Sequence, residues 1–268
     1  MRILAAAVGS IAGLASVLAA CGHQPPSAPP ASRPQQAADH VADAVNHVIA
    51  APVDPDPRVG AVFLGSSDLH ACTGSVLHSA AGNLVLTAAH CLGVGGPATF
   101  VPGFAGNAAP TNVWTVEALY LDPRWVASKD PRADYAIARV SRADGGSVEA
   151  QVGSALALGP APAKGSRVNV VAYAAGVGGM PIGCQASTGV NDDGYPELPC
   201  AGLVEGTSGA PWISGSTVTG VIGGLHGGGC AENLSYSSPF DGHVTDLLAR
   251  AEAGGPGDVP PAAFDDQC

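Results

Sequence analysis

Basic side chains are scarce in this chain of 268 residues, where 11 Lys and Arg stand against 22 Asp and Glu for a formal net charge of −11. Only Lys129 and Lys164 supply lysine, so the basic residues are mostly arginine. A protein that binds nucleic acid needs a positive surface to neutralise phosphates. The composition therefore argues against nucleic-acid binding, and equally against attachment to a membrane through a polybasic patch.

Metal-ligand spacings are also missing, since neither His-x3-His nor Cys-x2-Cys occurs in the chain. His70, His78 and His243, with Cys72 or Asp68, are the candidates to weigh for a metal site. No repeated spacing supports a metal site, so we favour positions at strand ends or on the surface for these residues. We expect neither a metal nor a cofactor.

Long helical patterns are rare, because 37 Gly and 23 Pro interrupt the chain. From Val59 onward, short apolar or alternating runs lie between Gly, Pro, Asn and Asp breaks. Examples are Val59–Leu64, Val113–Leu121, Tyr135–Val140, Val168–Tyr173 and Val218–Ile222. Such runs predict an all-β barrel or sandwich, and a hydrophobic content of 46% is enough for a substantial core.

One long apolar run, from Ile3 to Ala20, lies at the amino terminus and is followed by Cys21. It is rich in Ala, Gly and Ser and ends in small residues, as signal peptides do. Leu18–Cys21 resembles the bacterial lipobox, in which the cysteine is lipidated and becomes the first mature residue. We therefore predict a signal peptide over residues 1–21 and an exported protein anchored to the cell membrane through Cys21. A plain signal peptide or an anchor helix is the alternative.

Residues 22–57 are predicted to be a tether that contains one short helix. Residues 22–36 are rich in Pro, Gln and Ser, a composition typical of extended linkers. From Ala37 to Ala50 the apolar residues follow a helical spacing, which predicts an amphipathic helix. The prolines from Pro52 onward would end it, because proline cannot continue a helix.

A candidate nucleophile and base stand far apart in the sequence. Ser208 lies in the turn Gly206–Gly209, and His90 follows the short apolar run that ends in Ala89. A serine hydroxyl becomes a good nucleophile when a neighbouring base removes its proton, and imidazole titrates near neutral pH. Gly206 lets the backbone turn N–H groups inward, so the N–H groups of Gly206 and Ser208 are the candidate oxyanion hole.

Three segments in the order His, Asp, Ser resemble the catalytic segments of trypsin-like serine proteases: Thr87–Cys91, Asp134–Ile137 and Gly206–Gly209. The resemblance covers about residues 58–250 and is nearest to secreted bacterial members, including the glutamyl-endopeptidase-like group. It implies a Ser208 nucleophile, a His90 base and an Asp134 that orients the imidazole. Asp122, Asp130 and Asp144 lie near Asp134 in the sequence, but the strand predicted after Asp134 favours that residue.

The same resemblance implies an all-β fold of two six-stranded antiparallel barrels with a short closing helix. The barrels are expected at about 58–159 and 165–241, with a connection near 160–165 and the helix at about 242–252. A Pro-rich acidic tail over residues 253–268 completes the chain.

The odd number of cysteines limits how they can pair into disulfides. The chain has seven cysteines, and lipidation of Cys21 would leave an even set of six. Cys72 and Cys91 match the bridge that the family carries beside its catalytic histidine. For the other four cysteines we favour Cys184–Cys200 with Cys230–Cys268. The alternative, Cys200–Cys230, would resemble the bridge that flanks the specificity pocket in other members of the family.

The substrate pocket is expected at Gly202, Gly224 and His226. Gly202 stands where trypsin-like enzymes carry an aspartate that selects basic side chains, so cleavage after Lys or Arg is not expected. His226 either helps to recognise an acidic side chain, as a histidine does in glutamyl endopeptidases, or is a rim histidine, which we favour. Thr207 replaces the aspartate that pairs with a freed amino terminus in many animal members. We therefore expect activity without obligatory cleavage after Arg58.

These features predict a membrane-tethered, extracytoplasmic serine endopeptidase that acts as a monomer on protein or peptide substrates. The rival prediction is a catalytically silent lipoprotein that uses the protease fold as a binding or structural surface. An esterase that uses the same three residues is a further option.

Overall fold

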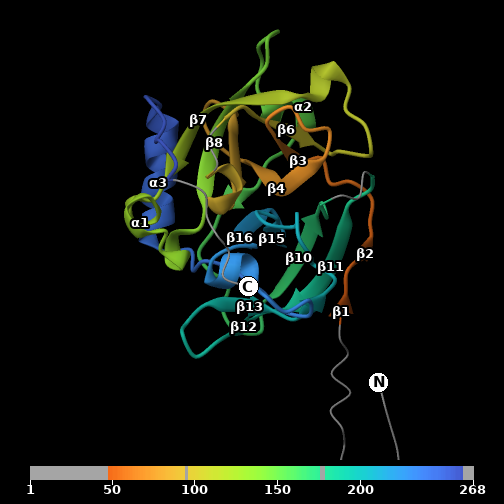
Figure 1. Cartoon of the computed structure of the whole chain (residues 1–268), viewed down its shortest axis with the longest axis vertical. Coiled ribbons are helices and arrows are strands. Elements are labelled where there is room, and N and C mark those ends of the chain that lie inside the picture. Colours follow the sequence, from red (N-terminus) through yellow and green to blue (C-terminus); the bar gives the residue numbers. More distant parts are fainter. Residues whose placement is uncertain (1–47, 94–95, 176–178, 262–268) are drawn as a thin grey trace, which may run out of the picture. The chain divides into compact units, whose positions relative to one another are not determined.

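The computed structural model describes residues 48–93, 96–175 and 179–261, and Figure 1 shows a predominantly β structure with few helices. All these residues belong to one unit of the chain. The predicted signal peptide with Cys21, most of the predicted tether, and Cys268 lie outside the described residues. Among the described residues, no helix combines the length and the apolar character needed to cross a bilayer.

Six antiparallel strands close into a barrel in the first half of the chain. In barrel order they are β3 (Val59–Leu64), β4 (His70–Leu77), β5 (Leu84–Thr87), β8 (Ala136–Ser141), β7 (Trp114–Leu121) and β6 (Ala98–Pro102). β6 closes the ring by pairing with β3, where Phe100 lies opposite Val62. Leu86 and Ile137, which face each other across β5 and β8, are fully buried in the core. The first of the two predicted barrels is therefore confirmed.

The second half of the chain pairs into several sheets. The largest has the order β2 (Ala51–Pro52), β11 (Ile182–Ser187), β10 (Arg167–Ala172), β15 (Pro211–Ser214), β16 (Thr217–Val221) and β9 (Ala157–Leu158). A three-stranded sheet holds β12 (Gly189–Val190), β13 (Pro196–Leu198) and β17 (Ser235–Tyr236). The sequence predicts the second six-stranded unit within residues 165–241, whereas β2 and β9 enter the largest sheet from outside that range.

The leading segment is a strand where the sequence predicts the end of a helix. Val48–Ile49 form β1, which pairs in parallel with β14 (Cys200–Ala201), and the Ala50 N–H donates to the Ala201 carbonyl at 2.8 Å. Helical spacing of apolar residues is only a local signal, and the open backbone groups of β14 outweigh it. The helix predicted over Ala37–Ala50 is therefore wrong for its last three residues.

The helices are short, as the glycine and proline content predicts. They are α1 (Pro123–Ser128), α2 (Val148–Val152) and α3 (Gly242–Ala253), with 3₁₀ turns η1 (His90–Leu92), η2 (Pro110–Asn112), η3 (Pro131–Ala133) and η4 (Leu225–Gly228). The Asp241 side chain caps the start of α3 by accepting from the His243 N–H at 2.9 Å. Buried Val244 and Leu247 belong to the same core cluster as Ile137 of the barrel. The predicted closing helix is confirmed.

The segment after α3 is tied to the first barrel through Asp258. Its carboxylate accepts from the Leu121 N–H at 2.7 Å and pairs with the Arg250 guanidinium at 2.7 Å. The Asp258 N–H donates to the Leu119 carbonyl at 2.7 Å.

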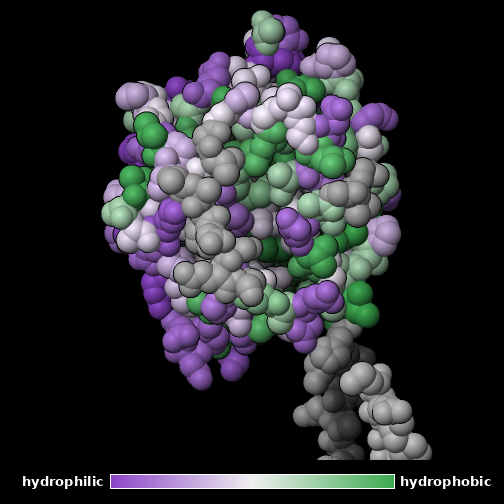
Figure 2. Space-filling view, in the orientation of Figure 1, coloured by the Kyte–Doolittle hydropathy of each residue, from purple (hydrophilic) through white to green (hydrophobic). Residues whose placement is uncertain are grey.

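On the face in Figure 2, hydrophilic residues gather at lower left, where Figure 1 places the hairpin of β12 and β13, and apolar residues gather nearer the middle.

Candidate active site

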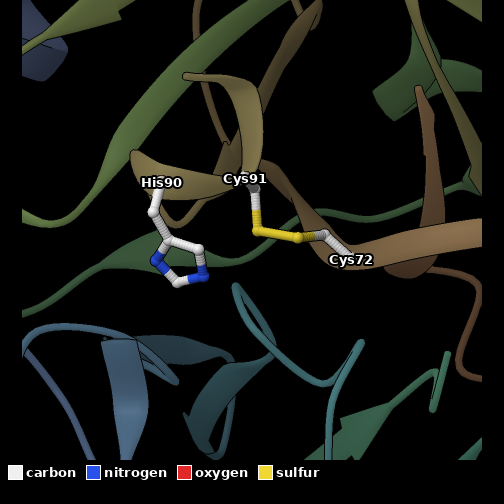
Figure 3. Close-up of side chains that lie close together, drawn as sticks. All are labelled: Cys72, His90 and Cys91. Atoms are coloured by element: carbon white, nitrogen blue, oxygen red, sulfur yellow. A yellow bond between two sulfur atoms is a disulfide. The ribbon is translucent and has the colours of Figure 1, made fainter. Parts of the chain in front are cut away.

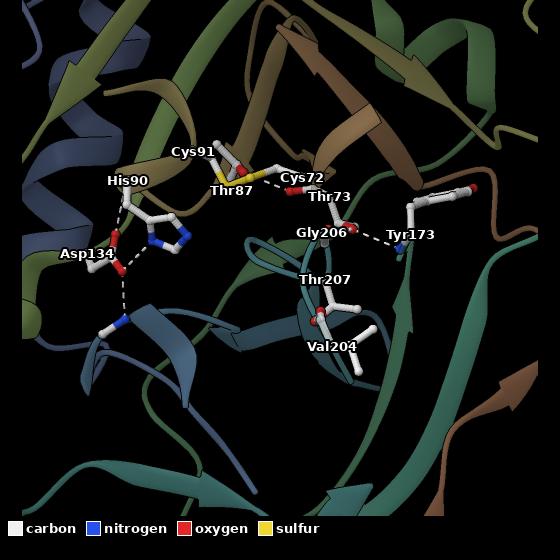
Figure 4. The surroundings of a disulfide bond; sticks show 11 residues. Cys72, Thr73, Thr87, His90, Cys91, Asp134, Tyr173, Val204, Gly206 and Thr207 are labelled. Atoms are coloured by element: carbon white, nitrogen blue, oxygen red, sulfur yellow. Dashed lines mark hydrogen bonds and ion pairs between the residues drawn. A yellow bond between two sulfur atoms is a disulfide. The ribbon is translucent and has the colours of Figure 1, made fainter. Parts of the chain in front are cut away.

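His90 and Asp134 meet because the strands next to them are paired. His90 follows β5 and begins η1, while Asp134 stands just before β8; Thr87 of β5 lies opposite Ala136 of β8. Although the two residues are 44 positions apart, His90 Nδ1 lies 2.8 Å from Asp134 Oδ2. The His90 backbone N–H donates to Asp134 Oδ1 at 2.9 Å, as Figure 4 shows. One carboxylate thus fixes both the ring and the backbone of His90.

Asp134 is held as a carboxylate in the protein interior. Its side chain is fully buried, and Oδ2 accepts a further hydrogen bond from the Gly224 N–H at 2.8 Å. Burial alone would raise the pKa of this carboxyl, but the electrostatic interaction with His90 and the three N–H donors outweigh burial, so the pKa lies below the ordinary value. The sequence assigns Gly224 to the substrate pocket, and the structure gives it this contact instead.

The hydrogen-bond pattern fixes the tautomer of His90. A carboxylate can only accept, so Nδ1 carries a proton and Nε2 is the nitrogen left to accept one. Figure 4 shows this second nitrogen directed away from Asp134, toward the side of the site where Gly206 and Thr207 lie. The His90 side chain keeps 15% of its surface exposed, so the ring is held firmly but can still be reached.

Ser208 lies on a loop that packs against the His90 side of the barrel. The Ser208 carbonyl accepts from the Thr73 N–H of β4 at 2.8 Å, and the Gly209 N–H donates to the Ile222 carbonyl at 2.7 Å. Gly209 has a φ of 79°, and a Cβ there would lie 2.2 Å from both the Thr73 carbonyl oxygen and Thr87 Oγ1. Only glycine permits this approach, which brings the loop of Ser208 against the strand end that leads to His90.

Two backbone N–H groups on this loop are the candidates for the oxyanion hole. The Glu205 carbonyl accepts from the Ala175 N–H at 2.7 Å, and a planar trans peptide then directs the Gly206 N–H the opposite way. Within the described part of the chain, neither the Gly206 nor the Ser208 N–H donates to a protein acceptor. Gly206 has a φ of 88°, and a Cβ there would lie 2.1 Å from the Ala175 nitrogen.

A pocket of about 340 Å³ adjoins Ser208. Besides Ser208 and exposed His226, its lining includes Glu205 and Glu232, together with loop backbone and small apolar side chains. Of the three residues predicted for the pocket, His226 lines it, whereas Gly202 and Gly224 are not part of the lining. The Gly202 N–H instead donates to the Glu232 carbonyl at 2.9 Å. The sequence pattern missed both carboxylates, because their segments carry no pocket motif.

The predicted bridge Cys72–Cys91 is present beside the histidine, with Cα atoms 6.1 Å apart. Figure 3 shows the two sulfurs bonded to each other next to the His90 ring. The ligand atoms of these three residues lie within 4.8 Å of one another, but bonded sulfurs cannot act as thiolate ligands. The cluster therefore does not make a metal site.

The predicted bridge Cys184–Cys200 is also present. This pairing excludes the alternative Cys200–Cys230. Cys230 is itself disulfide-bonded, and because its predicted partner Cys268 lies outside the described residues, Cys230–Cys268 stays a prediction.

No family model and no curated protein sequence matches this chain. Several solved structures, however, match it. The protease Anisep from Arthrobacter nicotinovorans is 23% identical with a TM-score of 0.66, over 77% of this chain and 100% of that one. A Glu endopeptidase is 16% identical with a TM-score of 0.60, over 77% and 98%. Human heparin binding protein is 17% identical with a TM-score of 0.61, over 79% and 99%. Together with the closed barrel and the closing helix, these likenesses show that the chain has the chymotrypsin fold.

Proposed function

We propose that the protein is a serine endopeptidase that hydrolyses peptide bonds through Ser208, His90 and Asp134. The observation that carries the proposal is the His90–Asp134 pair, with distances of 2.8 and 2.9 Å, on the same side of the barrel as the Ser208 loop. The N–H groups of Gly206 and Ser208, which have no acceptor among the described residues, and the adjoining pocket support the same proposal. A nucleophile, a fixed base, an oxyanion site and room for a side chain are the parts that acyl transfer needs.

In the proposed reaction, His90 Nε2 takes the Ser208 proton while Oγ attacks the scissile carbonyl. The oxyanion that forms is stabilised by the N–H groups of Gly206 and Ser208. His90 then gives the proton to the leaving amine, and a water molecule hydrolyses the acyl-enzyme by the same route. Asp134 stays ionised and stabilises the transient imidazolium, which its lowered pKa supports.

Replacing Ser208 by alanine tests the proposal. The variant should lose about four or more orders of magnitude in kcat on a peptide substrate and keep the unfolding midpoint of the wild type. Ser214→Ala is the matched control, because that serine is exposed on β15. If the Ser208 variant cleaves as fast as the control, the nucleophile lies elsewhere and the assignment is wrong. Parallel assays on a peptide and an ester separate a protease from an esterase.

We further propose that the chain is active without cleavage after Arg58. Val59, which would become the new amino terminus, is completely buried in β3, and the Arg58 guanidinium pairs with Asp56 at 2.6 Å. Thr207 Oγ1, at the position of the activating aspartate in animal enzymes, already donates to the Val204 carbonyl at 2.6 Å. The oxyanion loop thus has an internal support. A full-length chain that is inert until cut after Arg58 would overturn this proposal.

For localisation, we propose export and anchoring through a lipid on Cys21. The disulfides Cys72–Cys91 and Cys184–Cys200 favour an oxidising, extracytoplasmic compartment. Metabolic labelling with a fatty acid should mark the wild type and fail with Cys21→Ala. Equal labelling of the two proteins would exclude the anchor.

The rival function is binding without catalysis. A neighbour of the same fold is named for binding heparin, so the fold by itself does not establish turnover. A chain with −11 net charge is poorly suited to a polyanion of that kind, which favours the hydrolytic proposal. Failure of the wild type to turn over any peptide or ester would support the rival.

A further inference from the structure

Thr73 of β4 joins the Ser208 loop to the first barrel through its hydroxyl and its backbone N–H (Figure 4). Its side chain is fully buried, and its Oγ1 donates to the Gly206 carbonyl at 3.2 Å while accepting from the Tyr173 N–H at 2.9 Å. Its backbone N–H donates to the Ser208 carbonyl at 2.8 Å, and its carbonyl accepts from Thr87 Oγ1 at 2.7 Å. One residue thus bonds the carbonyls of both residues whose N–H groups form the proposed oxyanion site.

The contacts matter because the hydrogen bonds within the loop, such as those from Thr207 to the Val204 carbonyl, do not involve Gly206. Gly206, with a φ of 88°, occupies a conformation that glycine adopts freely, but glycine also leaves it easily. Rotation of the adjoining peptides would turn the Gly206 N–H out of the site. The bond from Thr73 Oγ1 to the Gly206 carbonyl opposes that rotation from one side, and the bond from Ala175 to the Glu205 carbonyl opposes it from the other.

We propose that Thr73 is a positioning residue for the oxyanion hole, an inference that rests on the proposed hydrolytic function. Thr73 follows Cys72, which is bridged to Cys91, and Cys91 follows His90. Thr87, which donates to the Thr73 carbonyl, stands shortly before His90 on the same segment. The same few residues of the barrel therefore hold both the oxyanion site and His90, which keeps the distance between these two parts of the site constant.

Thr73→Val tests this role, because valine keeps the shape and removes both hydrogen bonds of Oγ1. Loss of one oxyanion donor lowers kcat by about a hundredfold to a thousandfold, so a loosened donor should lower it by about tenfold to a hundredfold. KM should stay within about twofold, since the ground-state carbonyl gains little from the site. Thr73→Ser keeps the hydroxyl and should restore kcat to within about threefold of the wild type.

The matched control is Thr219→Val. Thr219 is buried on β16, and its Oγ1 donates to the Trp212 carbonyl of the paired strand β15 at 3.1 Å rather than to Gly206 or Ser208. This variant should lower the unfolding midpoint in the same way as Thr73→Val but leave kcat within about twofold. If Thr73→Val does not fold, Thr73→Ala replaces it, because alanine removes the same two hydrogen bonds without placing a methyl group against the unpaired N–H and carbonyl.

The outcomes are distinct. A fall in kcat at constant KM for Thr73→Val, with the serine variant rescued and the Thr219 control unaffected, supports the inference. A Thr73→Val enzyme with wild-type kcat, or an equal fall in the Thr219 control, overturns it while the proposed function stands. A wild-type protein that neither hydrolyses peptides nor reacts with a fluorophosphonate overturns the proposed function, and this inference with it.

Discussion

Replacing Asp134 by asparagine changes one carboxylate oxygen to an amide nitrogen and removes the charge. Three N–H groups point at this carboxylate: the His90 backbone at 2.9 Å, His90 Nδ1 at 2.8 Å and Gly224 at 2.8 Å. An amide offers one accepting oxygen, so in either orientation its NH2 group faces a donor. If NH2 takes the place of Oδ2, His90 Nδ1 must become the acceptor, and Nε2 then carries a proton and cannot act as base.

The magnitude follows from the lost charge. Opposite charges about 4 Å apart interact by about 4 kcal/mol at an effective dielectric constant of ~20. At about 1.4 kcal/mol per factor of ten, removing the partner of the His90 imidazolium lowers kcat by about three orders of magnitude. The wrong tautomer adds to this loss, for a total of about 10³-fold to 10⁴-fold.

The assay is steady-state hydrolysis of a peptide by Asp134→Asn beside Asp130→Asn. Asp130 is the matched control, because its carboxylate accepts from the Arg132 N–H at 2.9 Å, in the turn just before Asp134. The control should keep kcat within about twofold of the wild type. A folded Asp134→Asn protein with kcat within tenfold of the wild type would refute the reasoning, because His90 would then need no carboxylate.

Three further predictions concern stability and specificity. Burial alone would raise the pKa of the Asp122 carboxyl, but hydrogen bonds from Arg124 and Tyr135 hold it below the ordinary value. The ionised Asp122 carboxylate therefore contributes to the free energy of unfolding above about pH 4, and this contribution is lost as the pH falls through the lowered pKa. Urea titrations should then show that Asp122→Asn is more destabilising at pH 7 than at pH 3. Replacing both Cys72 and Cys91 by serine frees a loop with a sequence separation of 19, which should remove about 3 kcal/mol of the unfolding free energy; an unchanged urea midpoint would contradict this. Because Glu205 and Glu232 line the pocket, a peptide library at low salt should show cleavage after Gln about threefold faster than after Glu, and a preference for Glu would instead assign recognition to His226.

Short motifs made much of the site predictable. The Thr87–Cys91 and Gly206–Gly209 segments combine residue types whose chemistry is specific, and their order in the chain was enough to anticipate the fold. The contact between His90 and Asp134 follows from one strand pairing, that of β5 with β8. Local glycine and proline breaks in the same way predicted short strands and short helices.

Other features have no local signal. The bond from Thr73 to Gly206 joins residues 133 positions apart, and the bond from Gly224 to Asp134 joins residues 90 apart, so neither leaves a pattern in the sequence. The strand at Val48–Ile49 is defined by its pairing with β14, whereas its side-chain spacing also fits a helix. In such cases the local structure depends on contacts with residues far away in the sequence.

The most direct test of the central claim is to locate the adduct of a fluorophosphonate on the intact protein by peptide mass spectrometry. We expect one modified residue, Ser208, with labelling abolished in Ser208→Ala and strongly slowed in His90→Ala. An unlabelled wild-type protein, or an adduct on a different serine, would contradict it.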